Sequence, residues 1–122
     1  MMQAEQFIVV VAGRQRYAVP RHTVRSLQRV ATSPSLPGLA DLLGDTTAAD
    51  EQFGLVVADE QRNITLRVRH ADLRGRLPQF ELPAWIAPLA HPAVCGCILD
   101  ETELMPLVDL VQLARQIGHD AP

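Results

Sequence analysis

Residues 7–16 read FIVVVAGRQR, and residues 53–62 read FGLVVADEQR, so the chain nearly repeats itself. Phe, two of the valines, Ala, Gln and Arg recur at the same offsets in the two copies. Each copy is typical of an apolar strand, a polar turn and a returning strand, and a third hairpin of this kind follows at residues 94–109. Because one hairpin cannot bury its own apolar face, repeated hairpins in a short chain predict small β-barrels or packed sheets.

The composition is that of one compact domain. The chain has 122 residues, 48% of them hydrophobic, which is enough to form a core. The formal net charge of -3 argues against general binding to nucleic acid or to an anionic membrane. Neither a basic segment nor a long apolar run precedes Phe7, so we expect no secretion, no membrane insertion and a cytoplasmic location.

The segment after the first hairpin is predicted to be helical. A proline ends the hairpin and suits the first turn of a helix at residues 21–30, in which Val24 and Leu27 supply the apolar stripe. A second helical piece, at residues 39–43, is expected to end at Gly44.

The second half of the chain is predicted to hold two hairpins joined by a link. Residues 71–82 show no clear period and are expected to be irregular, and residues 83–86 are expected to begin a short helix that places Trp85 near the core. In the third hairpin Pro106 cannot donate a ladder hydrogen bond, so we expect its strand at a sheet edge or at a bulge.

The elements suggest how one domain is divided. Asp109 is expected to cap a closing helix at residues 110–117. The first hairpin and helix occupy residues 6–31, a linker follows at residues 32–52, and a second lobe occupies residues 53–118.

Side chains that could carry catalysis or hold a metal are scattered. The four histidines share no ligand-like spacing with one another or with Cys95 and Cys97, which we interpret as reduced, packed cysteines. Asp100, Glu101 and Glu103 form a carboxylate cluster at a hairpin tip, where turn formation and solubility explain them. With no nucleophile elbow and no Gly-rich phosphate loop, the sequence predicts a non-catalytic protein that needs no metal or cofactor.

One run of basic residues follows the second hairpin. A solvated strand face is the first interpretation, and an acidic protein partner is the second, since arginine is favoured at interfaces. Nucleic acid ranks third, because the run lacks the aromatic residues on which single strands stack. The run consists of Arg67, Arg69, His70, Arg74 and Arg76.

The order of these elements resembles the CheW-like domain, the family of bacterial chemotaxis coupling proteins and of the regulatory domain of their histidine kinase. The resemblance implies a mainly β fold with short helices, built as a pair of small SH3-like β-barrel lobes around a shared core. Residues 37–44 keep only the flanks of a strand pair that the family has there, so we expect an incomplete first lobe. The matching motifs are Tyr17-Ala18-Val19-Pro20, Val94-x-Gly96-x-x-Leu99 and Leu107-Val108-Asp109-Leu110-x-x-Leu113.

The resemblance also implies a function. CheW-like domains have no active site and connect chemoreceptors to a histidine kinase, so we expect a non-catalytic adaptor in a chemosensory or motility pathway. The residues expected to contact partners are Val24, Ser26 and Leu27 on the first helix, together with Arg67 and Arg69. A missing strand pair would also leave an exposed sheet edge, through which two copies of the chain could form a homodimer.

Two other functions stay open. The first is a small β-barrel module that binds nucleic acid through residues 67–76. The second is a sensor that holds a small ligand in a pocket between the lobes near Trp85.

Overall fold

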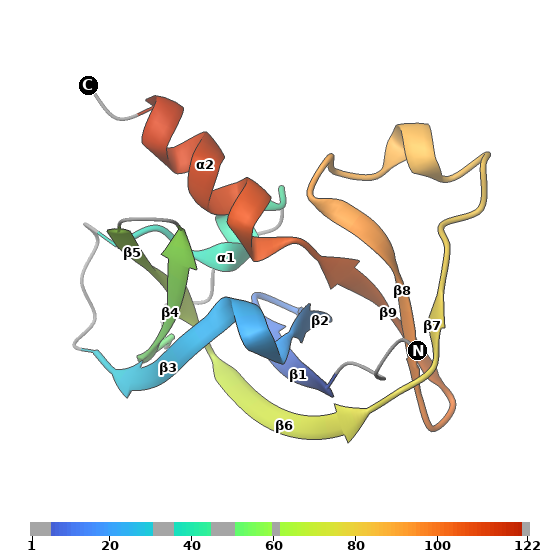
Figure 1. Cartoon of the computed structure of the whole chain (residues 1–122), viewed down its shortest axis with the longest axis horizontal. Coiled ribbons are helices and arrows are strands. Elements are labelled where there is room, and N and C mark those ends of the chain that lie inside the picture. The colour runs from blue at the N-terminus through green and yellow to red at the C-terminus, as the bar shows by residue number, and fades with distance from the viewer. Residues whose placement is uncertain (1–5, 31–35, 45–50, 60–61, 121–122) are drawn as a thin grey trace.

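The structure is a computed structural model that describes residues 6–30, 36–44, 51–59 and 62–120 (Figure 1). It confirms a mainly β fold with short helices. The strands are β1 (Gln6–Ala12), β2 (Gln15–Pro20), β3 (Val24–Arg29), β4 (Phe53–Asp59), β5 (Arg62–Val68), β6 (His70–Arg76), β7 (Gln79–Phe80), β8 (Val94–Asp100) and β9 (Glu103–Val108). The helices are η1 (Arg21–Thr23), α1 (Leu39–Leu42), η2 (Ala87–Leu89) and α2 (Leu110–Asp120), of which η1 and η2 are single 3-10 turns.

The three predicted hairpins are all present. β1 pairs with β2, β4 with β5 and β8 with β9, each pair antiparallel. In strand order the sheets are β6-β1-β2-β9-β8-β7 and β3-β4-β5. The hairpins are thus the local units from which both sheets are assembled, as the repeated sequence pattern predicts.

Two chain segments bend from one sheet into the other. β2 passes through η1 into β3, and β5 passes through the single residue Arg69 into β6. At this second bend the Arg69 backbone N–H donates a hydrogen bond of 2.8 Å to the Val11 carbonyl, which ties the bend to β1. The two sheets are open and not closed barrels, but the bends hold them face to face (Figure 1).

The main core fills the space between the two sheets and α2. Its fully buried side chains come from both sheets and from the helix, and α2 packs against β4. The expected helix cap is confirmed, because Asp109 Oδ1 accepts a hydrogen bond of 3.2 Å from the Gln112 backbone N–H. Among the core residues are Val10, Val19, Leu55, Val57, Leu66, Val68, Val108, Leu110 and Leu113.

A second, smaller core covers the other face of the six-stranded sheet. Phe7 and Val9 of β1 lie in it with Ile98 and Met105 of the β8–β9 hairpin. Because Val10 lies in the main core, β1 is buried on both faces. This explains why the first strand is a continuous apolar run and not an alternating one.

The predicted helix at residues 21–30 is wrong, because β3 occupies most of that segment and pairs with β4. Pairing with an available strand outweighs the weak local preference for helix. The register shifts between Val24 and Ser26, which indicates a bulge. A bulge adds one residue, so Val24 and Leu27 lie on one side of β3 despite a spacing that is typical of a helix.

The link between the second and third hairpins also differs from expectation. Residues 71–82 are not irregular, since β6 and β7 occupy most of them. A turn at residues 83–86 leads directly into the 3-10 helix Ala87–Leu89, but Trp85 is 75% exposed and not near the core. The prolines and the single aromatic residue of this segment are compatible with a surface link as well as with a buried helix. The sequence therefore did not reveal that the segment lies at the surface.

Pro106 does not lie at a sheet edge. Its strand β9 lies between β8 and β2, and it meets β2 through the parallel pair Ala18 and Leu107. A register shift does occur in this hairpin, between Val94 and Gly96 of the neighbouring strand β8. The bulge expected near Pro106 therefore lies on the partner strand.

The hydrogen-bonded ladders cross the expected lobe boundaries. β3, from residues 6–31, pairs with β4, and β1 pairs with β6, both partners coming from residues 53–118. Of the linker at residues 32–52, residues 32–35 and 45–50 lie outside the described part of the chain. Its described residues form α1 and one bridge, between Gly38 and Arg67.

Truncating a core leucine should destabilise the protein strongly. Leu66→Ala removes a fully buried side chain from the main core, and we expect the free energy of unfolding to fall by about 2–5 kcal/mol. The matched control is Leu89→Ala, because Leu89 is 82% exposed and its loss should change stability by less than about 0.5 kcal/mol. Urea denaturation followed by circular dichroism measures both, and equal effects would contradict the assigned core.

Candidate protein-interaction surface

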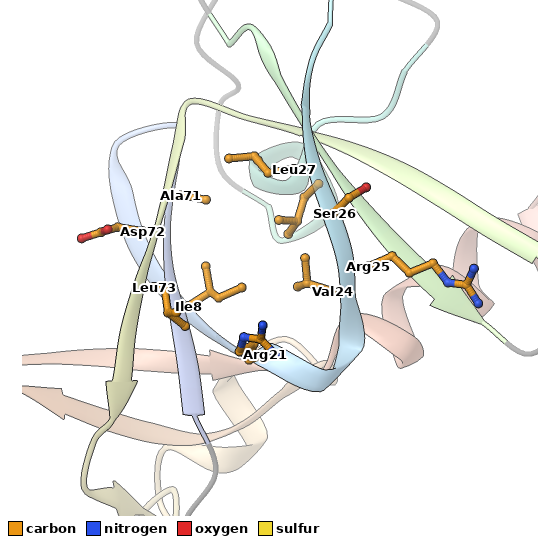
Figure 2. A pocket seen from close by; sticks show the side chains of 10 residues that line it. Ile8, Arg21, Val24, Arg25, Ser26, Leu27, Ala71, Asp72 and Leu73 are labelled. Atoms are coloured by element: carbon orange, nitrogen blue, oxygen red, sulfur yellow. The ribbon is translucent and has the colours of Figure 1, made fainter.

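A groove of about 300 Å³ lies between β3 and β6 (Figure 2). The structure places three of the predicted partner-binding residues, Val24, Ser26 and Leu27, along its β3 wall. They lie on a strand and not on the expected helix. The other lining residues are Ile8, Arg21, Arg25, Leu55, Ala71, Asp72 and Leu73.

The walls of the groove expose apolar side chains to water. Val24 of β3 and Ile8 of β1 point toward one another across it (Figure 2), and buried Leu55 forms part of its lining. Leu27 is 42% exposed and Leu73, on the opposite wall, is 54% exposed. Clustered exposed apolar side chains around a concave surface are typical of sites where another molecule binds.

The β3 side of the groove is basic. Arg21 and Arg25 line it, and the Arg29 guanidinium lies 5.6 Å from the centre of the Phe53 ring, within cation–π range. On the β6 side Asp72 points away from the groove (Figure 2), and its carboxylate lies 3.9 Å from Arg74 Nη1. β3 therefore carries positive charge beside an apolar groove, with the Arg25 side chain extending away from the groove interior (Figure 2).

Two arginines of the predicted basic run contact other parts of the chain. The half-buried Arg67 donates a hydrogen bond of 3.1 Å from Nε to the Leu36 carbonyl. Arg69 is exposed at the bend between β5 and β6, and Arg74 pairs with Asp100. Arg67 and Arg74 are thus engaged in contacts within the chain, whereas Arg69, His70 and Arg76 are exposed.

The carboxylate cluster of the third hairpin is a structural ion network. Asp100, whose side chain is only 5% exposed, accepts a hydrogen bond of 2.9 Å from Arg74 Nη2. That hydrogen bond, with the negative charge of Asp100, raises the pKa of Arg74. Arg16 of β2 lies 3.8 Å from Asp100 and also contacts Glu103. These ion pairs attach the tip of the β8–β9 hairpin to β6 and β2. Turn formation and solubility, which explained the carboxylates at the level of the sequence, do not predict this attachment.

The described residues offer no metal site. They contain no group of three or more His, Cys, Asp or Glu side chains that could hold a metal ion. Cys95 and Cys97 are free thiols, the first exposed and the second half-buried. His91 accepts a hydrogen bond of 3.0 Å at Nδ1 from the Ala93 backbone N–H, which fixes its orientation locally.

A second cavity, of about 410 Å³, lies beneath the link between β7 and β8. Tyr17, Met105 and Leu104 line it together with Ile86 and Ala90 of the link. Trp85, on which the small-ligand hypothesis was centred, is not among its lining residues. Fluorescence of that tryptophan is therefore a poor reporter for this cavity.

The fold has a clear relative among solved structures. The chain is similar to the crystal structure of the scaffolding protein TtCheW from Thermoanaerobacter tengcongensis, with a TM-score of 0.68 and 13% sequence identity. The similarity covers 91% of this chain and 92% of that one. No family model and no curated protein sequence matches the chain. No helix among the described residues is long and apolar enough to cross a membrane.

Removing the buried carboxylate should weaken the attachment of the third hairpin. Asp100→Ala deprives both Arg16 and Arg74 of a partner, so we expect a clear fall in the midpoint of urea denaturation. Glu103→Ala is the control, because its half-exposed carboxylate contacts Arg16 only and is screened by water. A control variant that loses as much stability as Asp100→Ala would contradict the assigned role of the buried group.

Proposed function

We propose that this protein is a non-catalytic cytoplasmic adaptor that links a chemoreceptor to a histidine kinase in a chemosensory or motility pathway. The observation that carries the proposal is the groove between β3 and β6, which exposes Leu27 and Leu73 on a fold similar to that of a scaffolding protein. An apolar groove with a charged rim is suited to binding another protein. The residues expected to contact partners, Val24, Ser26 and Leu27, line it together.

An adaptor needs a second surface for its second partner. The link between β7 and β8 carries the exposed apolar residues Trp85 and Leu89, and it lies on the opposite side of the molecule from β3 (Figure 1). Exposed aromatic and aliphatic side chains are the usual anchors of protein interfaces. Two separated apolar surfaces on one rigid fold would allow two proteins to bind at once.

The two predicted arginines contribute differently to this proposal. Arg69 is exposed at the bend and can meet an acidic group of a partner. The guanidinium of Arg67 already donates to the Leu36 carbonyl, so replacing it would disturb the packing of α1 as well as any interface.

Coupling by such an adaptor has a simple thermodynamic form. A protein without catalytic groups can transmit a signal only by binding the active and inactive states of its partners with unequal affinity. The groove would supply that difference if receptor or kinase states present different surfaces to it.

The experiment is a calorimetric titration of the protein with the chemoreceptor cytoplasmic domain and with the kinase regulatory domain of the same organism. We expect Leu27→Asp to weaken binding of one partner by about tenfold or more, because it places a charge against an apolar interface. The control is Gln28→Asp, since Gln28 is an exposed neighbour that does not line the groove. Absence of binding to both partners at high micromolar concentration, or equal losses in the two variants, would refute the proposal.

A further inference from the structure

In the part of the chain that the structure describes, no strand lies beside one edge of β3. β3 is the end strand of its sheet and pairs only with β4, and all its residues from Arg25 to Arg29 are exposed. Just beyond it, the Val30 backbone N–H donates a hydrogen bond of 2.8 Å to the Gln52 carbonyl, on the β4 side. Since successive N–H groups of a strand alternate in direction, those of Leu27 and Arg29 point away from β4, toward the free edge.

The free edge runs beside the groove. Leu27 and Leu55 are directly opposite one another in the β3–β4 ladder, so Leu27 lies on the core side of its sheet. With Val24 it forms the apolar wall that faces Ile8 (Figure 2). A strand added to this edge would direct every second side chain into the groove and gain backbone hydrogen bonds at the same time.

The charges along the edge indicate what kind of strand fits. β3 contains Arg25 and Arg29, follows Arg21, and has no acidic residue. None of these three arginines forms an ion pair with another described residue. If a second copy of β3 paired with this edge in antiparallel register about Leu27, Arg25 would meet Arg29, and like charges opposite one another destabilise a ladder. The positive charges of Arg25 and Arg29 would instead attract a strand that carries acidic side chains.

We propose that β3 binds an extended acidic segment of a partner protein as an added strand. Apolar side chains of the segment enter the groove on the Leu27 face of β3, and its carboxylates point to the other face, toward which Arg25 extends (Figure 2). Arg29 lies on the same face as Leu27, so it pairs with a carboxylate at the end of the segment, where the alternation stops. The proposal deepens the adaptor function, on which it rests, by naming how one partner is recognised and the chemistry of its binding segment.

The probe is the synthetic peptide acetyl-EVEVEVE-amide, with acetyl-KVKVKVK-amide as its control. NMR-detected hydrogen exchange should slow at the Leu27 and Arg29 amides when the acidic peptide binds, because those N–H groups acquire acceptors. The Gln28 amide points toward β4, so its exchange should change little. Equal binding of both peptides, or no slowing at Leu27 and Arg29, would overturn the proposal.

Two variants test the backbone and the charges separately. Leu27→Pro removes an outward N–H without removing a bond to β4, whereas Leu27→Ala removes only the side chain. We expect Leu27→Pro to weaken peptide binding by about tenfold relative to Leu27→Ala, and an equal affinity would overturn strand addition. The double change Arg25→Glu and Arg29→Glu keeps the backbone intact and should reverse the preference toward the lysine peptide. Circular dichroism verifies the folding of each variant, and the charge reversal stays decisive if Leu27→Pro does not fold.

The full-length partners separate this proposal from the adaptor function. If receptor and kinase domains bind Leu27→Pro as tightly as the unaltered protein, strand addition is wrong while the adaptor function stands. If neither domain binds the unaltered protein but the acidic peptide still slows exchange at Leu27 and Arg29, the β3 site stands and the adaptor function is wrong. Self-association that rises with protein concentration and is abolished by Leu27→Pro would identify a second copy as the occupant and overturn the acidic partner.

Discussion

Neither sheet can bury its apolar face without the other, and this constraint determines the rest of the molecule. Leu55 and Leu66 from the three-stranded sheet meet Val10 and Val19 from the six-stranded sheet in one core, and α2 covers the remaining opening. The bends at η1 and Arg69 let the same chain segments serve both sheets, so the sheets cannot separate unless their ladders break. The groove beside β3 is lined by side chains from both sheets, so its shape depends on this shared core.

The hairpins could be predicted from the sequence because each is a local unit with its own turn. Their assembly could not, since it depends on pairings between distant segments such as β1 with β6. β3 shows most clearly where prediction from residue spacing fails. Its bulge places Val24 and Leu27 on one side of the strand, although their spacing is typical of one face of a helix. Trp85 shows that residue type alone does not predict burial. A large apolar residue on a short link can be exposed to solvent.

The candidate site was predicted in part. Val24, Ser26 and Leu27 do come together, because residues close in sequence stay close on any regular element. Arg67 and Arg74 instead contact other parts of the chain, the Leu36 carbonyl and Asp100 respectively. The pairing of Asp100 with Arg16 and Arg74 was missed because it joins three strands that the sequence separates widely. Long-range side-chain pairs of this kind leave no periodic signal in a single sequence.

We propose that this small fold holds two proteins at once, through separate surfaces at β3 and at the link between β7 and β8. Light scattering coupled to size-exclusion chromatography, on an equimolar mixture of the protein, the chemoreceptor cytoplasmic domain and the kinase regulatory domain, tests it directly. The account predicts a single species whose mass is that of all three components together. A mixture containing only pairwise complexes, in which each partner displaces the other, would contradict it.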